Sequence, residues 1–116
     1  EKIVEQGLLY DFYGELLTEH QRNVYEDAVY NDMSLTEIAE QYGISRQGVH
    51  DLIRRCDKLL AGYEEKLRLV QKFTEAKRKM EQINSLADEA KCLPDNACRE
   101  CLDRIRELTA ELMENF

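Results

Sequence analysis

Two short amphipathic segments joined by a tight turn constrain this chain more than any other feature of its sequence. Ser34, followed by Glu three residues later, forms a capping-box pattern, and the apolar spacing after it predicts a helix over 35–42. Gly43 suits the left-handed position that commonly ends a helix, and Ser45 can cap a second helix over 46–60. The two predicted helices are therefore separated only by residues 43–45.

The side chains of the two segments indicate how the helices meet. Ala39 is small at the point where two helices crossing at a steep angle come closest. The apolar residues spaced to converge between the helices are Ile38, Tyr42, Ile44, Val49 and Leu52. Any two tightly joined amphipathic helices would show such an apolar pattern. The small residue at the crossing, the glycine in the turn and the two capping serines occur together here, which favours a helix-turn-helix over 34–60.

The remainder of the chain also predicts helices. One Pro, five Gly and no Trp in 116 residues are too few turn residues for a sandwich, a barrel or a βαβ fold. Apolar residues recur three and four positions apart, which predicts an all-α fold of five to six helices. The further helices are expected over 3–17, 19–30, 63–90 and from Asp95 or Asn96, as the capping residue, to Met113. Thr18, followed three residues later by Gln21, is a capping-box pattern at the start of the helix over 19–30, and the helix over 63–90 is either separate from the helix over 46–60 or continuous with it.

Two domains are expected from this pattern. Residues 1–62 form a helical domain that contains the helix-turn-helix, and residues 63–116 form a long-helix extension. The extension packs on the helical domain or on a dimer partner, since helices this long cannot all bury their apolar stripes in one small bundle. The last helix is expected to bury Cys98, Cys101, Leu102, Ile105, Leu108 and Leu112.

Charge is distributed unevenly along the chain. The formal net charge of −8 argues against a general affinity for nucleic acid. Residues 1–45 carry two basic and ten acidic side chains, residues 46–79 carry ten and five, and residues 80–116 carry four and nine. The middle block, with a net charge of +5, is therefore the predicted contact for a polyanion.

The outward face of the second predicted helix supplies the candidate nucleic-acid-binding residues. They are Ser45, Arg46, Gln47, Gly48, His50, Arg54, Arg55 and Lys58. Arginines can grip phosphates or a guanine edge, Gln47 can bond a base, and Gly48 permits close approach of the backbone. Asp51 on the same face disfavours phosphate, and the alternative for Arg54 and Arg55 is an ordinary solvated helix face.

Three runs of residues resemble region 4 of bacterial sigma factors: Leu17-Thr-Glu-His-Gln-Arg, Ser34-Leu-Thr-Glu-Ile-Ala-Glu and Gly43-Ile-Ser-Arg-Gln-Gly-Val. With Arg46-Gln-Gly-Val-His-Asp, Arg54-Arg55 and Tyr63-Glu-Glu-Lys-Leu, the chain more closely resembles the small bacterial YlxM-like family, from about Leu8 to Phe73. This resemblance implies an all-α protein with a sigma-like helix-turn-helix and no catalytic motif.

The resemblance also implies a partner. Genes of this family typically neighbour those of the signal recognition particle GTPase and its receptor, and the family is thought to contact the particle's RNA or modulate its GTPases. The family usually has Ala where this chain has Gly48 and an aromatic residue where it has His50. Both departures bear on base recognition more than on the fold.

No motif of an enzyme or of a cofactor site is present in the sequence. Cys98-x-x-Cys101, with Cys92 as a third ligand, could form part of a zinc site, but no fourth ligand lies nearby and small core residues are favoured. There is no glycine-rich phosphate loop and no nucleophile motif. The chain is therefore expected to be non-enzymatic, with no metal and no cofactor.

We thus expect a cytoplasmic, soluble protein without a membrane span that binds nucleic acid, with signal recognition particle RNA favoured over duplex DNA. The signal recognition particle GTPases are further candidate partners. Two alternatives stay open, a DNA-binding transcriptional regulator and a helical protein–protein adaptor. Surplus apolar surface on the helices over 63–90 and 98–112 predicts a homodimer.

Overall fold

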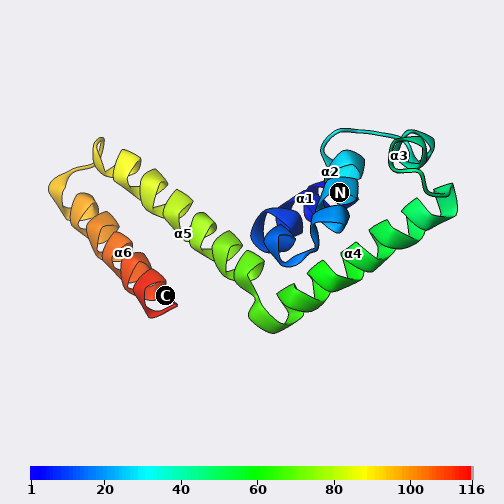
Figure 1. The fold of residues 1–116 in the computed structure, drawn as a ribbon. Coiled ribbons are helices and arrows are strands. Elements are labelled where there is room, and N and C mark those ends of the chain that lie inside the picture. Colours follow the sequence, from blue (N-terminus) through cyan, green and yellow to red (C-terminus); the bar gives the residue numbers. More distant parts are fainter. Residues whose placement is uncertain (116) are drawn as a thin grey trace. The chain divides into compact units, whose positions relative to one another are not determined.

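The computed structural model describes residues 1–115, which contain six α-helices, one 3₁₀ turn and no strand (Figure 1). The elements are α1 (Lys2–Tyr13), η1 (Gly14–Leu16), α2 (Glu19–Val29), α3 (Leu35–Tyr42), α4 (Arg46–Leu67), α5 (Leu69–Ala90) and α6 (Asp95–Glu114). The predicted all-α class is confirmed. The contacts divide the chain into an N-terminal unit, Glu1–Val70, and a C-terminal unit that begins at Gln71.

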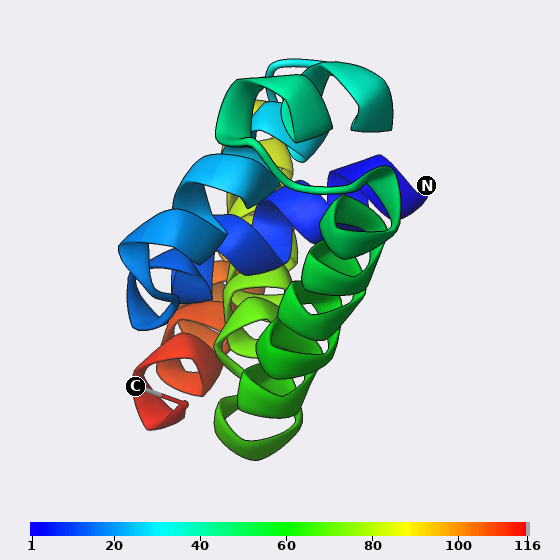
Figure 2. The ribbon, with the colours of Figure 1, turned by 45° about the vertical axis from the view of Figure 1, so that its right-hand side comes forward.

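The core of the N-terminal unit forms where α1 and α2 pack against α4. Its buried residues are Tyr13, Leu17, Tyr25, Cys56 and Leu60, and Leu9, Val29, Leu52 and Val70 pack around them. A second cluster, Val24, Ile38, Ala39 and Val49, joins α2, α3 and α4. Figure 2 shows α3 leading into the N-terminal end of α4, with α1 beside that helix. The cores thus fix α4 along its length and leave its opposite face outward.

Local hydrogen bonds set the ends of α2, α3 and α4. The predicted capping boxes at Thr18 and Ser34 are both complete, with reciprocal bonds to Gln21 and Glu37. Gly43 takes the left-handed conformation with φ of 68°, and the N–H of the next residue donates to the Ala39 carbonyl at 3.1 Å. The predicted bounds of α3 and the predicted start of α4 are confirmed.

Tyrosine hydroxyls donating to carboxylates hold the helices of the N-terminal unit together. Each bond joins two different helices, at 2.5 to 2.6 Å: Tyr10–Glu26, Tyr13–Glu64, Tyr25–Asp57, Tyr30–Asp11 and Tyr42–Asp27. Several of the acidic residues that make the first block of the sequence so negative are therefore acceptors inside the fold.

The long helices are interrupted at Arg68, which has a left-handed φ of 55°. The Leu69 N–H donates to the Tyr13 hydroxyl at 3.1 Å, and the Val70 N–H donates to Glu64 Oε1 at 3.0 Å. The helix that begins at Arg46 continues past Tyr63, which is one of the two alternatives that the sequence left open, but it ends at Leu67, so the expectation of one unbroken helix over 63–90 was wrong. Gly62, which suggested that boundary, lies inside α4.

The C-terminal unit is an antiparallel pair formed by α5 and α6 (Figure 1). Ala76, Cys101 and Leu108 are its buried residues among those described, and Lys79 Nζ lies 4.0 Å from Glu111 Oε2. Two expectations fail here. Leu102 was expected to be buried but is 52% exposed. Asp95 or Asn96 was expected to cap α6, but the N-cap residue is Pro94 and no side chain caps this helix.

No helix within residues 1–115 is both long enough and apolar enough to cross a membrane.

Candidate nucleic-acid interface

The candidate interface is the outward face of α4, opposite the side that is buried in the core. Val49, Cys56 and Leu60 define the buried side. Exposed residues at spacings of four, three and four lie on the opposite side of the helix: Gln47, Asp51, Arg54 and Lys58. We call these four residues the outward face of α4. The helix-turn-helix therefore presents polar side chains where a recognition helix needs them.

Three of the predicted residues meet at one point on the exposed surface of α4. Arg54, Arg55 and Lys58, together with Asp51, line an open hollow of about 250 Å³, which we call the basic hollow. Its three cations outnumber its one carboxylate. Such a set of side chains can bind an oxyanion such as a phosphate group, because guanidinium groups can bind its oxygens through paired hydrogen bonds.

The first turn of α4 holds the other predicted residues. Ser45 Oγ accepts from the Gly48 N–H at 2.9 Å, so this hydroxyl caps the helix. A Cβ added at Gly48 would lie 3.1 Å from Ser45 Oγ, which is tight, so glycine at this position leaves the cap uncrowded. Arg46 is exposed beside the cap and does not line the basic hollow.

Asp51 organises two further predicted residues, which the sequence alone did not indicate. Gln47 Nε2 donates to Asp51 Oδ1 at 2.9 Å, and His50 Nδ1 lies 3.8 Å from the same oxygen. A glutamine and an aspartate four residues apart on a helix can pair, so the spacing allows this contact without determining it. The carboxylate orients the Gln47 side chain and lowers the positive potential of the face.

None of the four cysteines is among the residues of this face, because Cys56 lies on the buried side of α4 and the other three belong to the C-terminal unit. Cys56 and Cys101 are buried, and all four cysteines are free thiols. Burial raises the pKa of the Cys56 thiol to about 11, so it is protonated at neutral pH. Among residues 1–115, no group of three or more histidine, cysteine and acidic side chains is arranged to hold a metal ion.

An all-α unit in which α3 and α4 form a capped helix-turn-helix belongs to the class of helix-turn-helix proteins. Comparison with known proteins makes this class specific. Residues 1–97 match the UPF0122 family, described as "Putative helix-turn-helix protein, YlxM / p13 like", and the chain belongs to this family. The match extends beyond Phe73, where the resemblance noted from the motifs ends.

Relatives with the name UPF0122 protein occur in several bacteria. The relative from Shouchella clausii is 42% identical over 112 residues, which cover 93% of this chain and 97% of the relative. The relative from Desulforamulus reducens is 48% identical over 82 residues, which cover 71% of this chain and 70% of the relative. The relative from Caldanaerobacter subterraneus is 54% identical over 76 residues, which cover 66% of this chain and 65% of the relative. Membership in a helix-turn-helix family supports a nucleic-acid-binding regulatory role.

Proposed function

We propose that this protein is a non-enzymatic accessory protein of the signal recognition particle pathway that binds the particle's RNA through α4. The basic hollow carries the proposal, because it gathers Arg54, Arg55 and Lys58 at one point on the exposed face of the helix-turn-helix. The choice of partner is supported by the resemblance to the YlxM-like family, whose genes neighbour those of the particle's GTPases. The protein is proposed to act in the cytoplasm, and the GTPases of the particle are further candidate partners.

Structured RNA suits this face better than a long DNA duplex. Asp51 lies in the middle of the outward face, where it opposes a continuous phosphate backbone. The flanking blocks of the sequence, with net charges of −8 and −5, repel polyanions from the rest of the chain. A short, oriented contact with the phosphates of a folded RNA needs only the cationic part of α4.

A titration at two salt concentrations tests this proposal. Fluorescence anisotropy would compare signal recognition particle RNA with random duplex DNA at about 50 and about 200 mM salt. We expect tighter binding to the RNA, and we expect Arg54→Ala/Arg55→Ala to reduce the salt slope by about 2. The matched control is Arg99→Ala/Arg106→Ala, which removes two exposed arginines of α6 and should leave the slope unchanged.

Two results would overturn the proposal. Absence of RNA binding at low salt leaves the adaptor alternative, which predicts no salt-dependent binding to either nucleic acid. Equal losses in both double variants would mean that any removed positive charge acts alike and that α4 has no special role.

A second candidate function, DNA-binding transcriptional regulation, is favoured by the helix-turn-helix geometry itself. The second helix of such a motif commonly lies in the major groove, and a dimer then reads two related half-sites. Selection from a random duplex library tests this function. Recovery of a two-fold-related consensus would favour it over RNA binding, and recovery of none would exclude it.

We also propose that the protein is a homodimer that associates through its long helices. Exposed apolar side chains on these helices support this proposal: Leu69, Met80, Leu102 and Met113 are 41%, 53%, 52% and 75% exposed. Sedimentation velocity at micromolar concentration should give a dimer, and Met80→Ser should shift it toward the monomer. A monomeric wild-type protein at this concentration contradicts the proposal.

A further inference from the structure

An open apolar groove runs between α1 and the end of α2, in a part of the N-terminal unit that the proposed function does not use. Its volume is about 370 Å³, and its lining residues are Ile3, Val4, Gly7, Leu8, Asp11, Val29 and Tyr30. Ile3, Val4 and Tyr30 are 58%, 64% and 50% exposed. Large apolar side chains gathered in one exposed hollow indicate an interaction surface more strongly than scattered ones do.

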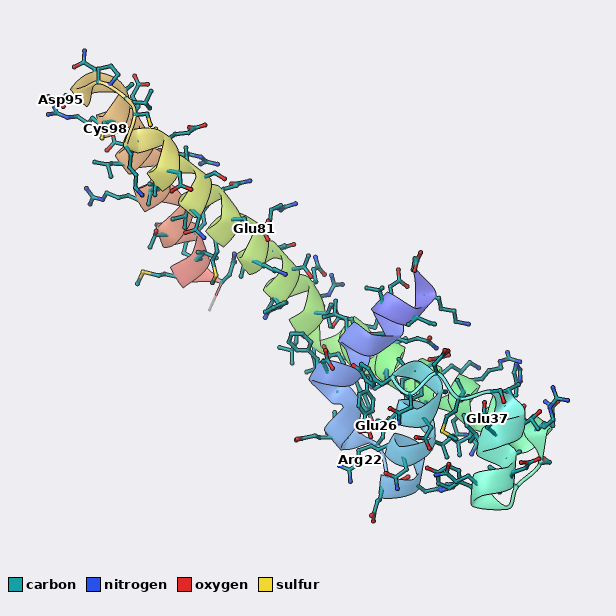
Figure 3. The ribbon with its side chains drawn as sticks, turned by 90° about the horizontal axis from the view of Figure 1, so that it is seen from above. Arg22, Glu26, Glu37, Glu81, Asp95 and Cys98 are labelled. Atoms are coloured by element: carbon teal, nitrogen blue, oxygen red, sulfur yellow. The ribbon has the colours of Figure 1, made fainter. Side chains whose placement is uncertain are left out.

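An acidic hollow continues this apolar groove along the same helix. Its volume is about 340 Å³, and three carboxylates, from Asp11, Glu15 and Glu26, line it with a single cation, Arg22. Asp11 lines both spaces. Arg22 and Glu26 lie one turn apart on α2 (Figure 3). The surface thus changes from apolar beside the start of α1 to acidic where the end of α1, η1 and α2 meet.

The walls of the two spaces are held in place by hydrogen bonds. Tyr30 Oη lies 2.6 Å from Asp11 Oδ1 and 2.9 Å from the Gly7 carbonyl oxygen. The Tyr10 hydroxyl donates to Glu26 Oε1 at 2.5 Å, and the rings of Tyr10 and Tyr30 make an edge contact at 5.8 Å. A binding surface fixed in advance loses little conformational entropy when a ligand binds.

We propose that this face of α1 and α2 binds a cationic amphipathic helix of a partner protein. Apolar side chains of that helix occupy the apolar groove, and its lysines or arginines pair with the carboxylates of the acidic hollow. Charge complementarity selects this partner, because residues 1–45 carry ten acidic and only two basic side chains, which repel nucleic acid. From Ile3 to Glu15 the face is about 18 Å long, which matches about 12 residues of a docked helix.

This surface and the basic hollow face different directions. α1 and α2 pack against the buried side of α4, whereas the basic hollow lies on the outward side of that helix. Nucleic acid and the cationic helix can therefore bind at the same time. The protein would then hold a basic protein segment close to the nucleic acid that it binds.

The test uses a synthetic fluorescent helix of about 14 residues, with leucines along one side and lysines along the other. Its comparators have the same length, one with every Lys replaced by Glu and one with every Leu replaced by Ser. We expect Val4→Ser to weaken binding of the Leu/Lys helix about fivefold, since it removes an apolar contact that becomes buried when the helix binds. We expect Glu15→Gln to reduce the salt dependence of binding.

The matched controls are Leu93→Ser, between α5 and α6, and Glu114→Gln on α6, which make the same kinds of change at exposed positions elsewhere. Circular dichroism would verify that all variants keep their helices. The proposal is overturned if the Leu/Glu helix binds as well as the Leu/Lys helix, or if the control variants weaken binding equally. Loss of RNA binding in Val4→Ser would assign the groove to nucleic acid, and dissociation of a dimer in that variant would assign it to a second copy; either result also overturns the proposal.

Discussion

The carboxylate of Asp51 lies among the side chains that we assign to phosphate binding. It accepts from Gln47 at 2.9 Å and lines the basic hollow with two arginines and a lysine. Asp51→Asn removes its negative charge and keeps an acceptor for Gln47. We expect this variant to bind RNA about fivefold more tightly at low salt, because about 1 kcal/mol of repulsion is removed. Anisotropy titration measures the change.

Asp103→Asn is the control for this prediction, since Asp103 is an exposed aspartate on α6 and the change in net charge is identical. Tightening in both variants would show that only the total charge matters. Unchanged binding in Asp51→Asn would show that the phosphate passes at a distance from this part of α4.

A second residue-scale prediction concerns the buried hydroxyl of Tyr25. This ring is fully buried, and its hydroxyl donates to Asp57 Oδ1, which also accepts from Gln6 Nε2 at 3.0 Å. Tyr25→Phe should lower the free energy of unfolding by about 2 kcal/mol, because a bond to a carboxylate is lost. Urea denaturation measures this change. The control is Tyr30→Phe, at a ring that is half exposed, which should lower the free energy of unfolding by less. Equal losses in the two variants would contradict the role of burial.

At the scale of single residues, the sequence predicted which side chains of α4 face outward but not how they pair. Helical spacing places Arg54 and Lys58 one turn apart, and in the structure they line one hollow together with Arg55. The contacts made by Asp51 depend on rotamers, which spacing alone does not determine. Tyr25 and Asp57 are 32 residues apart, so no local pattern could have paired them.

At the scale of elements, two glycines offer opposite predictions for the same substitution. Gly43 ends α3 with φ of 68°, whereas Gly62 lies inside α4, and an added Cβ at either position meets nothing within 4 Å. Gly43→Ala should destabilise the protein by about 1 kcal/mol through backbone strain alone. Gly62→Ala should stabilise it by about 0.5 to 1 kcal/mol, because alanine favours the helix.

Urea denaturation of both variants measures these two changes, with one common m-value, the dependence of the free energy of unfolding on urea concentration, used in the fits. A stabilising Gly43→Ala would mean that the turn can leave the left-handed region without cost. A destabilising Gly62→Ala would mean that the flexibility of glycine is needed in the middle of α4.

The elements that the sequence predicted well are those defined by local chemistry. The bounds of α3, both capping boxes and the turn at Gly43 follow from residues within a few positions of one another. The break at Arg68 follows from a distant residue, since the Leu69 N–H donates to Tyr13, which lies 56 residues earlier. A local reading placed the break near Gly62 for lack of this information.

At the scale of the whole molecule, four tyrosines whose hydroxyls donate to carboxylates predict loss of stability at alkaline pH. Burial, aided by a hydrogen bond to a carboxylate, raises the pKa of Tyr10, Tyr13 and Tyr25 above the ordinary value near 10, and raises that of Tyr30 to about 12. The folded state therefore holds protons that the unfolded state releases. Stability should be intact below pH about 10 and should fall as the pH rises further.

Ultraviolet absorbance of tyrosinate, followed together with circular dichroism, measures this transition. We expect these four tyrosines to ionise as the helices melt, in one cooperative step. Ionisation well before the loss of helix would contradict the prediction, because it would show that the hydroxyls reach solvent in the folded protein.

The two units differ in how much apolar surface they bury, and this difference predicts unequal local stability. The N-terminal unit buries eight large or medium side chains almost completely or completely, including Tyr13, Tyr25, Ile38 and Leu60. Among its described residues, the C-terminal unit buries Ala76, Cys101 and Leu108. Amide protons of α6 should therefore exchange through openings of lower free energy than those of α4.

Hydrogen exchange at several protein concentrations tests this difference and the proposed dimer together. If a second copy covers the exposed apolar residues of α5 and α6, such as Met80 and Met113, protection of these helices should rise with protein concentration. Protection of α4 should stay constant, because its core lies within one unit. Equal protection of α4 and α6 at every concentration would contradict the difference between the units. Protection that differs between α4 and α6 but does not change with protein concentration would support the difference in local stability between the units and would contradict dimerisation through α5 and α6.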